Sequence, residues 1–76
     1  MIEELSLVRL VRPISSPAVP VGSVGTVLIV YEHPYRAFEV EFINAQRKTL
    51  VDIETGEITF TVREEDVEPC AEVAME

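Results

Sequence analysis

The chain has little of the chemistry that builds metal, redox or cofactor sites. Its 76 residues include one cysteine, one histidine and no tryptophan. A single cysteine excludes an internal disulfide, and one cysteine with one histidine supplies too few ligands for structural zinc. No apolar run approaches the roughly 20 residues that cross a bilayer, and the opening residues, MIEELSL, are acidic rather than signal-like. We therefore expect a cytoplasmic protein with no metal, no cofactor and no membrane segment.

Positive charge is scarce as well. Six Lys and Arg residues stand against 14 Asp and Glu residues, which gives a formal net charge of −8. Such a charge repels phosphate backbones and attracts cationic partners, and it also keeps a small protein soluble whether or not it binds anything. The negative charge can be interpreted as a surface for a basic protein partner or simply as a means of solubility. Under both interpretations nucleic acid is a disfavoured partner.

Two antiparallel strands within residues 21–42 organise the rest of the sequence. The first, Val24–Tyr31, is apolar on both faces, with Val27 and Ile29 on one face and Leu28 and Val30 on the other. In the second, apolar residues alternate with glutamates at Phe38, Glu39, Val40, Glu41 and Phe42. This alternation predicts a strand with one buried face and one wet face.

Further segments with the same period of two complete a β protein. The predicted strands are Leu5–Val11, Lys48–Ile53, Ile58–Val62 and a short last strand at Val67. Inward-facing side chains are expected at Val8, Leu10, Thr49, Val51, Ile53, Ile58, Phe60 and Val62. Leu50 falls on the polar side, where it either covers one end of the core or is exposed. Gly56 supplies the left-handed backbone for a hairpin turn at Glu54–Glu57, and Arg63–Asp66 predicts a single 3-10 turn.

The longest loop is expected at Pro13–Gly22, which contains three of the five prolines. Proline lacks the N–H group that a helix interior or a central strand requires, so this segment is extended and irregular. A loop of this length in so small a domain suggests a binding role. The alternative is a covering loop whose apolar residues Ile14, Val19 and Val21 cap one end of the core.

These elements predict an all-β fold, a small SH3-like antiparallel barrel of five to six strands with a single 3-10 turn before the last strand. Closing a small sheet into a barrel removes its exposed edges. An OB-type barrel is the competing architecture, but it usually needs a longer chain and an inserted helix. We assign residues 1–70 to the barrel domain, beginning with an acidic lead-in at residues 1–4, and residues 71–76 to a flexible tail.

One pattern extends over nearly the whole chain. It runs through Leu7–Leu10, Val21–Gly22, Val24–Val27, Val30–Tyr31, Ala37–Phe42 and Asp66–Val67. This pattern resembles the domain-of-unknown-function family 4926, whose members are small bacterial proteins, and the resemblance implies an SH3-like fold without established catalytic residues. The chain departs from the family pattern in its proline-rich loop and in extra hairpin length at Asp52–Ile58. Proteins of this size are similar in kind to antitoxins or accessory proteins that act beside a partner.

The candidate binding residues gather at one predicted turn and on one predicted wet face. They are Tyr31, His33, Tyr35, Arg36, Glu39 and Glu41. Tyrosine and arginine are favoured at protein interfaces because they combine contact area with a polar tip. The two glutamates, together with Asp52, Glu54 and Glu57 on the next hairpin, would form an acidic patch for a basic partner. The alternative is a solvated hairpin beside the ordinary solvent side of a sheet.

No set of residues in the sequence has the arrangement of an active site. Paired carboxylates act as acid and base only in a cleft that buries one of them, which Glu39 and Glu41 on an outward face do not offer. Ser15 and Ser16 lack an activating base, and Cys70 has no basic neighbour that would activate its thiol. We therefore predict a protein without catalytic residues.

The leading hypothesis is a small non-enzymatic protein-interaction module, antitoxin-like or accessory, that binds a basic partner protein. The first alternative is a nucleic-acid-binding barrel, because Gly22, Gly25 and Val27 resemble the KOW element of ribosomal and transcription-factor barrels. Those barrels carry basic loops, so this alternative needs most of the six basic residues to converge on one surface. The second alternative is an accessory subunit of a larger enzyme complex. A monomer or a weak homodimer fits each of these roles.

Overall fold

The computed structural model describes residues 2–70 and shows an all-β chain with one short 3-10 helix. The elements are β1 (Leu7–Leu10), β2 (Val24–Tyr31), β3 (Ala37–Ile43), β4 (Phe60–Arg63), the 3-10 helix η1 (Glu64–Asp66) and β5 (Val67–Pro69). The prediction of an all-β fold with a single 3-10 turn before the last strand is confirmed. The predicted tail, residues 71–76, lies outside the described residues. No helix in the described range is long and apolar enough to cross a bilayer.

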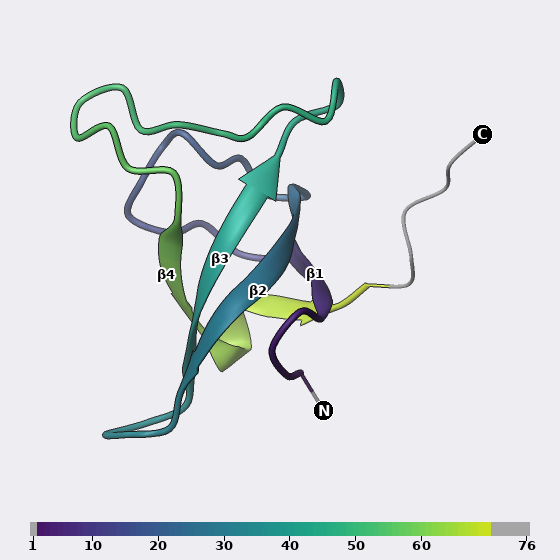
Figure 1. Ribbon diagram of the computed structural model, residues 1–76, viewed down its shortest axis with the longest axis vertical. Helices are drawn as coiled ribbons and strands as arrows, with labels where there is room; N and C mark the ends of the chain where they lie inside the picture. The colour runs from purple at the N-terminus through teal and green to yellow at the C-terminus, as the bar shows by residue number, and fades with distance from the viewer. Residues whose placement is uncertain (1, 71–76) are drawn as a thin grey trace.

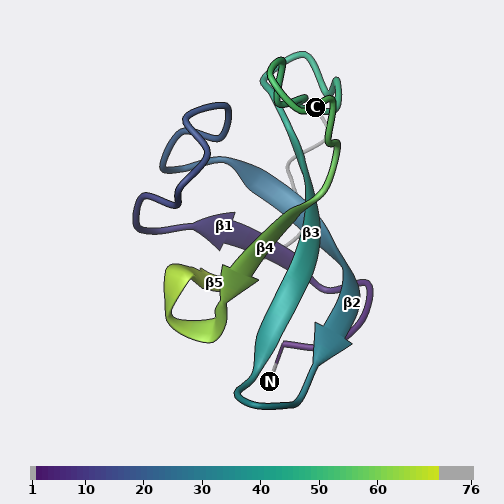
Figure 2. The ribbon, with the colours of Figure 1, turned by 90° about the vertical axis from the view of Figure 1, so that its left-hand side faces the viewer.

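All five strands belong to one antiparallel sheet in the order β4-β3-β2-β1-β5. Figure 1 shows β2 and β3 as the long central pair, with Val24 opposite Ile43 at one end and Tyr31 opposite Ala37 at the other. Figure 2 shows β1 crossing behind β3 and β4, and buried side chains of these three strands belong to one cluster. The sheet is therefore bent over its own core, and η1 joins its two edge strands, β4 and β5.

The core is formed by the inward faces of the strands. Its buried hydrophobic residues are Ile2, Val8, Leu10, Val19, Val27, Phe38, Val40, Phe42, Phe60, Val62 and Val67. Phe42 of β3 and Phe60 of β4 contact each other, with ring centroids 6.3 Å apart. The alternation predicted for β3 and the inward positions predicted for β1 are confirmed.

Close packing of β2 on β3 depends on Gly25. This glycine lies opposite Phe42 in β3 and opposite Val8 in β1. A Cβ atom added to it would lie 2.6 Å from the carbonyl oxygen of Glu41 and 2.7 Å from Cγ1 of Val40. Such distances are too short for carbon contacts, so any larger residue would push the two strands apart.

A β-bulge reverses the facing of the second half of β2. Val27 and Ile29 pair with consecutive residues of β3, which leaves Leu28 as an extra residue. One extra residue shifts the alternation of the strand by one position. Ile29 is consequently 47% exposed, while Val30 packs against the core. The prediction that Val27 and Ile29 share one face of the strand is therefore wrong.

The arm, residues 44–59, connects β3 to β4 and runs along the top of the molecule in Figure 1. A strand was predicted within it at Lys48–Ile53. In the described chain this segment forms one isolated bridge, between Thr49 and Ile43, so the predicted strand is wrong. The reason lies in the sheet, because β4 already occupies the first half of the edge of β3.

Side chains of the arm also face differently from the prediction. Leu50 packs against the core, so it covers one end rather than being exposed. Val51, Ile53 and Ile58 were predicted to face inward, but all three are exposed, and Ile53 is 94% exposed. Gly56 does form the predicted turn, with a φ of 78°.

Two segments outside the strands contribute to the core. Val19 of the proline loop, residues 13–22, is buried and Ile14 packs partly against the core, whereas Val21 is exposed. Ile2 is only 6% exposed, although it was assigned to an acidic lead-in. The proline loop thus has the covering role that was one of its two interpretations, and the lead-in is part of the fold.

Candidate functional site

The side chains of the predicted binding turn between β2 and β3 lie on two different sides of the sheet. Arg36 lies against the core, with its guanidinium 5.5 Å from the centre of the Phe38 ring and its side chain 17% exposed. Its nitrogens lie 2.8 Å from a carboxylate oxygen of Glu32 and 3.5 Å from one of Glu64, and it donates a hydrogen bond to the carbonyl oxygen of Ile2. Arg36 therefore links the N-terminal segment and η1 to the turn, and most of its surface is covered.

Tyr31 and Tyr35 lie on the outer face, the wet side of β2, β3 and β4. The hydroxyl of Tyr31 donates a hydrogen bond of 3.4 Å to Glu39. The Arg63 guanidinium lies 4.3 Å from the centre of the Tyr35 ring. Both tyrosines are exposed, and His33, in the turn between them, is exposed as well. The outer face therefore carries aromatic and guanidinium groups of the kind that protein interfaces favour.

Glu39 and Glu41 hold neighbouring segments by accepting hydrogen bonds from hydroxyl groups. Glu39 accepts one of 2.8 Å from Thr59 and one of 2.7 Å from Thr61. Glu41 accepts one of 2.8 Å from Thr49. Thr49 thus lies on the wet side, contrary to its predicted inward position. Both carboxylates are oriented by the fold, because their partners belong to β4 and the arm.

Glu39 also lines a groove of about 410 Å³ between the proline loop and the arm. The groove is lined by Ile14, Ser15, Ser16, Pro17, Glu39, Asp52, Glu54, Thr55, Glu57, Thr59, Phe60 and Thr61. Four of these residues are acidic and none is basic, so we call it the acidic groove. The sequence suggested that Asp52, Glu54 and Glu57 lie near Glu39, and the structure brings these four together. Glu41 does not line the groove.

Asp52, like Glu39, is a carboxylate of the acidic groove that hydrogen bonds hold in place. It accepts hydrogen bonds from the backbone N–H groups of Glu54 at 2.9 Å and Thr55 at 3.3 Å, and from the hydroxyl of Ser16 at 3.0 Å. These bonds favour the ionised form, so they lower the pKa of Asp52, the Glu54 N–H most strongly. Because Ser16 belongs to the proline loop, Asp52 also joins the two walls of the groove.

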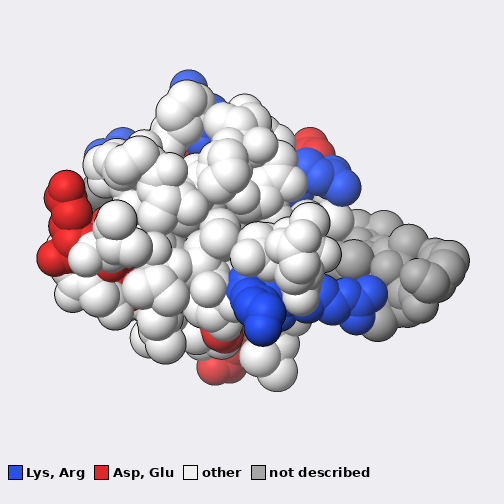
Figure 3. Space-filling view, turned by 90° about the horizontal axis from the view of Figure 1, so that it is seen from above, with Lys and Arg blue, Asp and Glu red and all other residues white. Residues whose placement is uncertain are grey.

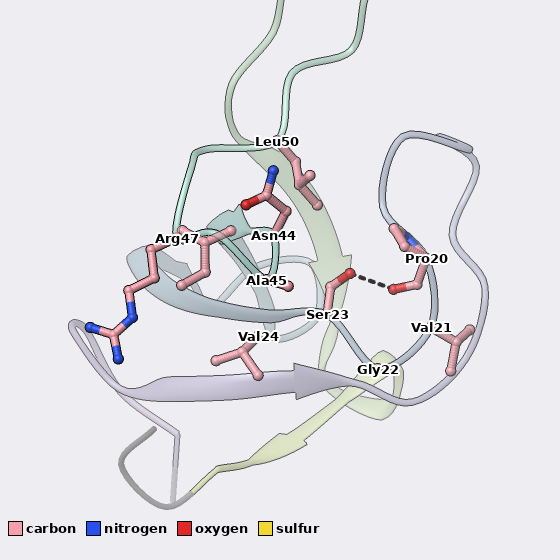
Figure 4. Close-up of a pocket in the computed structure, with 10 residues that line it drawn as sticks. Pro20, Val21, Gly22, Ser23, Val24, Asn44, Ala45, Arg47 and Leu50 are labelled. Carbon is pink, nitrogen blue, oxygen red and sulfur yellow. Dashed lines mark hydrogen bonds between the residues drawn. The ribbon is translucent and has the colours of Figure 1, made fainter. Parts of the chain in front are cut away.

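A second groove, of about 730 Å³, lies where β2 begins and β3 ends (Figure 4). Its lining consists of Pro20, Val21, Gly22, Ser23, Val24, Ile43, Asn44, Ala45, Arg47 and Leu50. We call it the apolar groove, since Arg47 is the only charged residue among the described residues that line it. Figure 4 shows Arg47 on one side, with Pro20 and Val21 on the other. None of the binding residues predicted from the sequence lines this groove.

Hydrogen bonds between residues close in the sequence hold both walls of the apolar groove. On one wall the hydroxyl of Ser23 donates to the carbonyl oxygen of Pro20 at 2.6 Å. On the other wall the side-chain oxygen of Asn44 accepts from the backbone N–H groups of Gln46 at 2.9 Å and Lys48 at 3.0 Å. Sequence reasoning missed this groove. The positions of the two turns could have indicated it, since antiparallel pairing of β2 with β3 brings the start of one strand beside the end of the other.

Ionic binding of a cationic group is the chemistry that the acidic groove offers. Two of its carboxylates, Glu39 and Asp52, are held in place by hydroxyl and N–H donors, as described above. Within residues 2–70 no group of three His, Cys, Asp or Glu side chains is placed to share a metal ion. An arginine or lysine side chain, whose donors match carboxylate oxygens, suits the groove instead.

Residues 4–67 match the model of one protein family, described as a domain of unknown function (DUF4926). The chain belongs to the DUF4926 family. The matched range runs from before β1 to the first residue of β5, so the DUF4926 model covers both grooves and the outer face. The resemblance drawn from the sequence pattern is therefore confirmed. Comparison with curated proteins and with solved structures finds no match.

Proposed function

We propose that this DUF4926 protein is a non-enzymatic interaction module of the bacterial cytoplasm that binds a basic segment of a partner protein. The observation that supports this function is the acidic groove, in which four carboxylates line one recess without any Lys or Arg. An antitoxin-like protein that binds a basic toxin and an accessory subunit of a larger enzyme complex would both use such a site.

The shape and lining of the acidic groove suit an extended segment. Ile14 and Pro17 offer apolar surface on one wall, against which the aliphatic stem of a lysine or arginine can lie while its charged tip reaches a carboxylate. Glu54 and Glu57 are exposed and can turn toward a partner, whereas Glu39 and Asp52 are already oriented. Preoriented charges bind at a lower entropic cost, and opposite charge speeds encounter.

Ion pairs of the basic residues favour a protein partner over nucleic acid. Arg9 lies 3.0 Å from Glu68, and Arg36 pairs with Glu32 and Glu64. Arg12 and Arg63 each lie 4.0 Å from a carboxylate of η1, that of Asp66 and that of Glu65. A nucleic-acid surface needs basic side chains directed together at phosphates, and these four arginines face acids of their own chain.

A labelled arginine- and lysine-rich peptide tests the proposal against the variant E54K/E57K. Both glutamates are exposed, so the variant should keep the fold. We expect the peptide to bind the variant at least about tenfold more weakly in fluorescence anisotropy, because two attractive contacts become repulsive. Added salt should weaken binding to the original chain more than binding to the variant, since fewer favourable ionic contacts remain to be screened.

The matched control is E3K/E4K, which makes the same change in net charge at residues that do not line the acidic groove. We expect this control to bind within about twofold of the original chain, because exposed charges beyond a Debye length are largely screened. Equal losses in the two variants would show that binding follows net charge rather than the groove, and would refute the proposal. In the native cell, the protein that cross-links to the original chain and not to E54K/E57K should be basic.

A further inference from the structure

A smaller recess adjoins the acidic groove. It has a volume of about 360 Å³ and is lined by Pro17, Ala18, Val51, Asp52, Ile53 and Glu54. We call it the Ile53 recess. Four of its six lining residues are apolar, whereas the acidic groove is lined mainly by polar and acidic residues. Pro17, Asp52 and Glu54 line both sites, so the recess and the groove share part of their walls.

Hydrogen bonds hold both walls of the Ile53 recess. The hydroxyl of Ser16 donates to Asp52 at 3.0 Å and accepts from the backbone N–H group of Ala18 at 3.3 Å. The backbone N–H group of Asp52 donates to the carbonyl oxygen of Glu57 at 3.0 Å, and the carbonyl oxygen of Asp52 accepts from Gly56 at 2.6 Å. Because these backbone groups already have partners within the chain, the recess offers a ligand mainly apolar contact.

Two aliphatic side chains of the Ile53 recess remain in contact with water. Val51 is 43% exposed and Ile53 is 94% exposed. An aliphatic side chain gains free energy when it leaves water, and the described chain covers little of these two. An apolar side chain of a partner placed against them would remove apolar surface of both molecules from water, which would stabilise the complex.

The charge around the recess favours a basic partner. Asp52 and Glu54 supply two carboxylates, and none of the described lining residues is basic. Figure 3 looks down onto the arm and shows acidic side chains at its left edge, on the side where the arm turns in Figure 1, beside uncharged surface. A second copy of the chain carries a net charge of −8 and would be repelled from this site.

We propose that the Ile53 recess binds an aliphatic side chain of the same partner segment whose lysine or arginine binds in the acidic groove. The proposal rests on the function proposed above and adds a requirement to it, namely that the basic segment also carries an aliphatic residue. Because the two sites share part of their walls and an extended chain advances about 3.3 Å per residue, we expect the aliphatic and basic residues within about three positions of each other. The partner is then selected by this combination rather than by positive charge alone.

Two labelled peptides test this requirement in fluorescence anisotropy. The leucine peptide is rich in arginine and lysine and has one leucine next but one to an arginine, and the serine peptide differs only in having serine in place of that leucine. We expect the original chain to bind the leucine peptide at least about fivefold more tightly, because its leucine leaves water in the recess. Added sodium chloride should weaken both peptides and leave this ratio nearly unchanged, since salt screens the ionic contacts and not the apolar ones.

I53S and E57K separate the contributions of the two sites. Of these sites, Ile53 lines only the recess and Glu57 lines only the acidic groove. I53S should bring the ratio of the two affinities close to one without changing the affinity of the serine peptide. E57K should weaken both peptides and keep the ratio. I58S is the matched control and should keep the ratio, since Ile58 is 51% exposed on the arm and lines neither site.

Failure of this proposal can be distinguished from failure of the proposed function. A ratio near one for the original chain, with both peptides weakened by E57K, would overturn the role of the recess and leave the acidic groove as a binding site. A ratio that I53S leaves unchanged, or that I58S reduces equally, would overturn the role of the recess as well. If neither peptide binds the original chain, the proposed function fails and this proposal fails with it.

Discussion

The carboxylates that line the acidic groove have different roles. Glu39 and Asp52 accept hydrogen bonds from hydroxyl groups of other segments, so they hold β4, the arm and the proline loop together. Glu54 and Glu57 lie in the same groove with exposed side chains. Residue type does not separate these two pairs. Only the contacts show that the first pair stabilises the site and the second is available to a partner.

The pKa of Asp52 predicts a dependence of stability on pH. Because this pKa is lowered in the folded chain from its usual value of 3.8, ionised Asp52 stabilises the fold at pH values above the unfolded pKa. That contribution disappears as the pH falls through the folded pKa. We expect D52N to melt at a lower temperature than the original chain at pH 7, and the difference to vanish near pH ~2, measured by thermal denaturation followed by circular dichroism.

E57Q is the matched control for this measurement. Glu57 also lines the acidic groove, but among the described residues its carboxylate makes no hydrogen bond comparable to those of Asp52. We expect its melting temperature to stay close to that of the original chain throughout the titration. A difference for D52N that persisted at the lowest pH would contradict a role for the ionised carboxylate.

The paired strands β2 and β3 approach each other closely at Gly25, which has no side chain to prevent it. We expect G25A to lower the free energy of unfolding by about 1–3 kcal/mol, because its Cβ atom would overlap backbone and core atoms of β3 and the core would be overpacked. Urea denaturation measures the loss. G56A gives a comparison, since Gly56 has a φ of 78° and open space around it, so it costs only left-handed backbone strain, about 1 kcal/mol. Equal stability of G25A and the original chain would refute the close approach.

The arm shows why an alternating sequence is not enough to make a strand. Thr49, Val51 and Ile53 have the same period of two as β3, yet only Thr49 pairs with a neighbouring strand. A strand needs a free edge of suitable length, and β4 has taken the first half of the edge of β3. Val51, Ile53 and Ile58 of the arm are therefore exposed, whereas Leu50 packs against the core.

The stability of the whole molecule depends on a small core, in which the loss of one large side chain matters. A domain of this size rarely has more than about 3–5 kcal/mol of stability, and removing a buried phenylalanine ring costs about 3–5 kcal/mol. Phe42 is fully buried and contacts the ring of Phe60. We therefore expect F42A to be largely unfolded at 25 °C, with loss of dispersion in its amide NMR spectrum.

F42L is the companion variant, because it keeps most of the buried volume and should remain folded at a cost of about 1.5 kcal/mol or less. A well-dispersed spectrum for F42A would show that other contacts supply more stability than the core described here. Loss of folding in both variants would instead point to a specific need for the aromatic pair with Phe60.

The amino-acid sequence by itself determined the β class, the central strand pair and the grouping of acidic residues. Alternation at Phe38, Val40 and Phe42, the turn at Gly56 and the charged 3-10 turn are local signals, because they depend on neighbours within a few residues. The family membership follows from the same pattern along the chain. Glu39 was likewise placed on a wet face by alternation, and Tyr31 and Tyr35 were placed at the turn before it.

Tertiary structure decided which of these residues share a surface. The bulge at Leu28 turned Ile29 outward, and pairing of β4 with β3 left most of the arm unpaired. Contacts with Ile2 and Glu64 hold Arg36 on the core side of the sheet. Each outcome depends on contacts between segments that are distant in the sequence, and a local pattern carries no information about which edge is already occupied. The apolar groove lies where pairing brings the start of β2 beside the end of β3, and the exposure of Ile53 follows from the competition for the edge of β3. Only the folded chain reveals either feature.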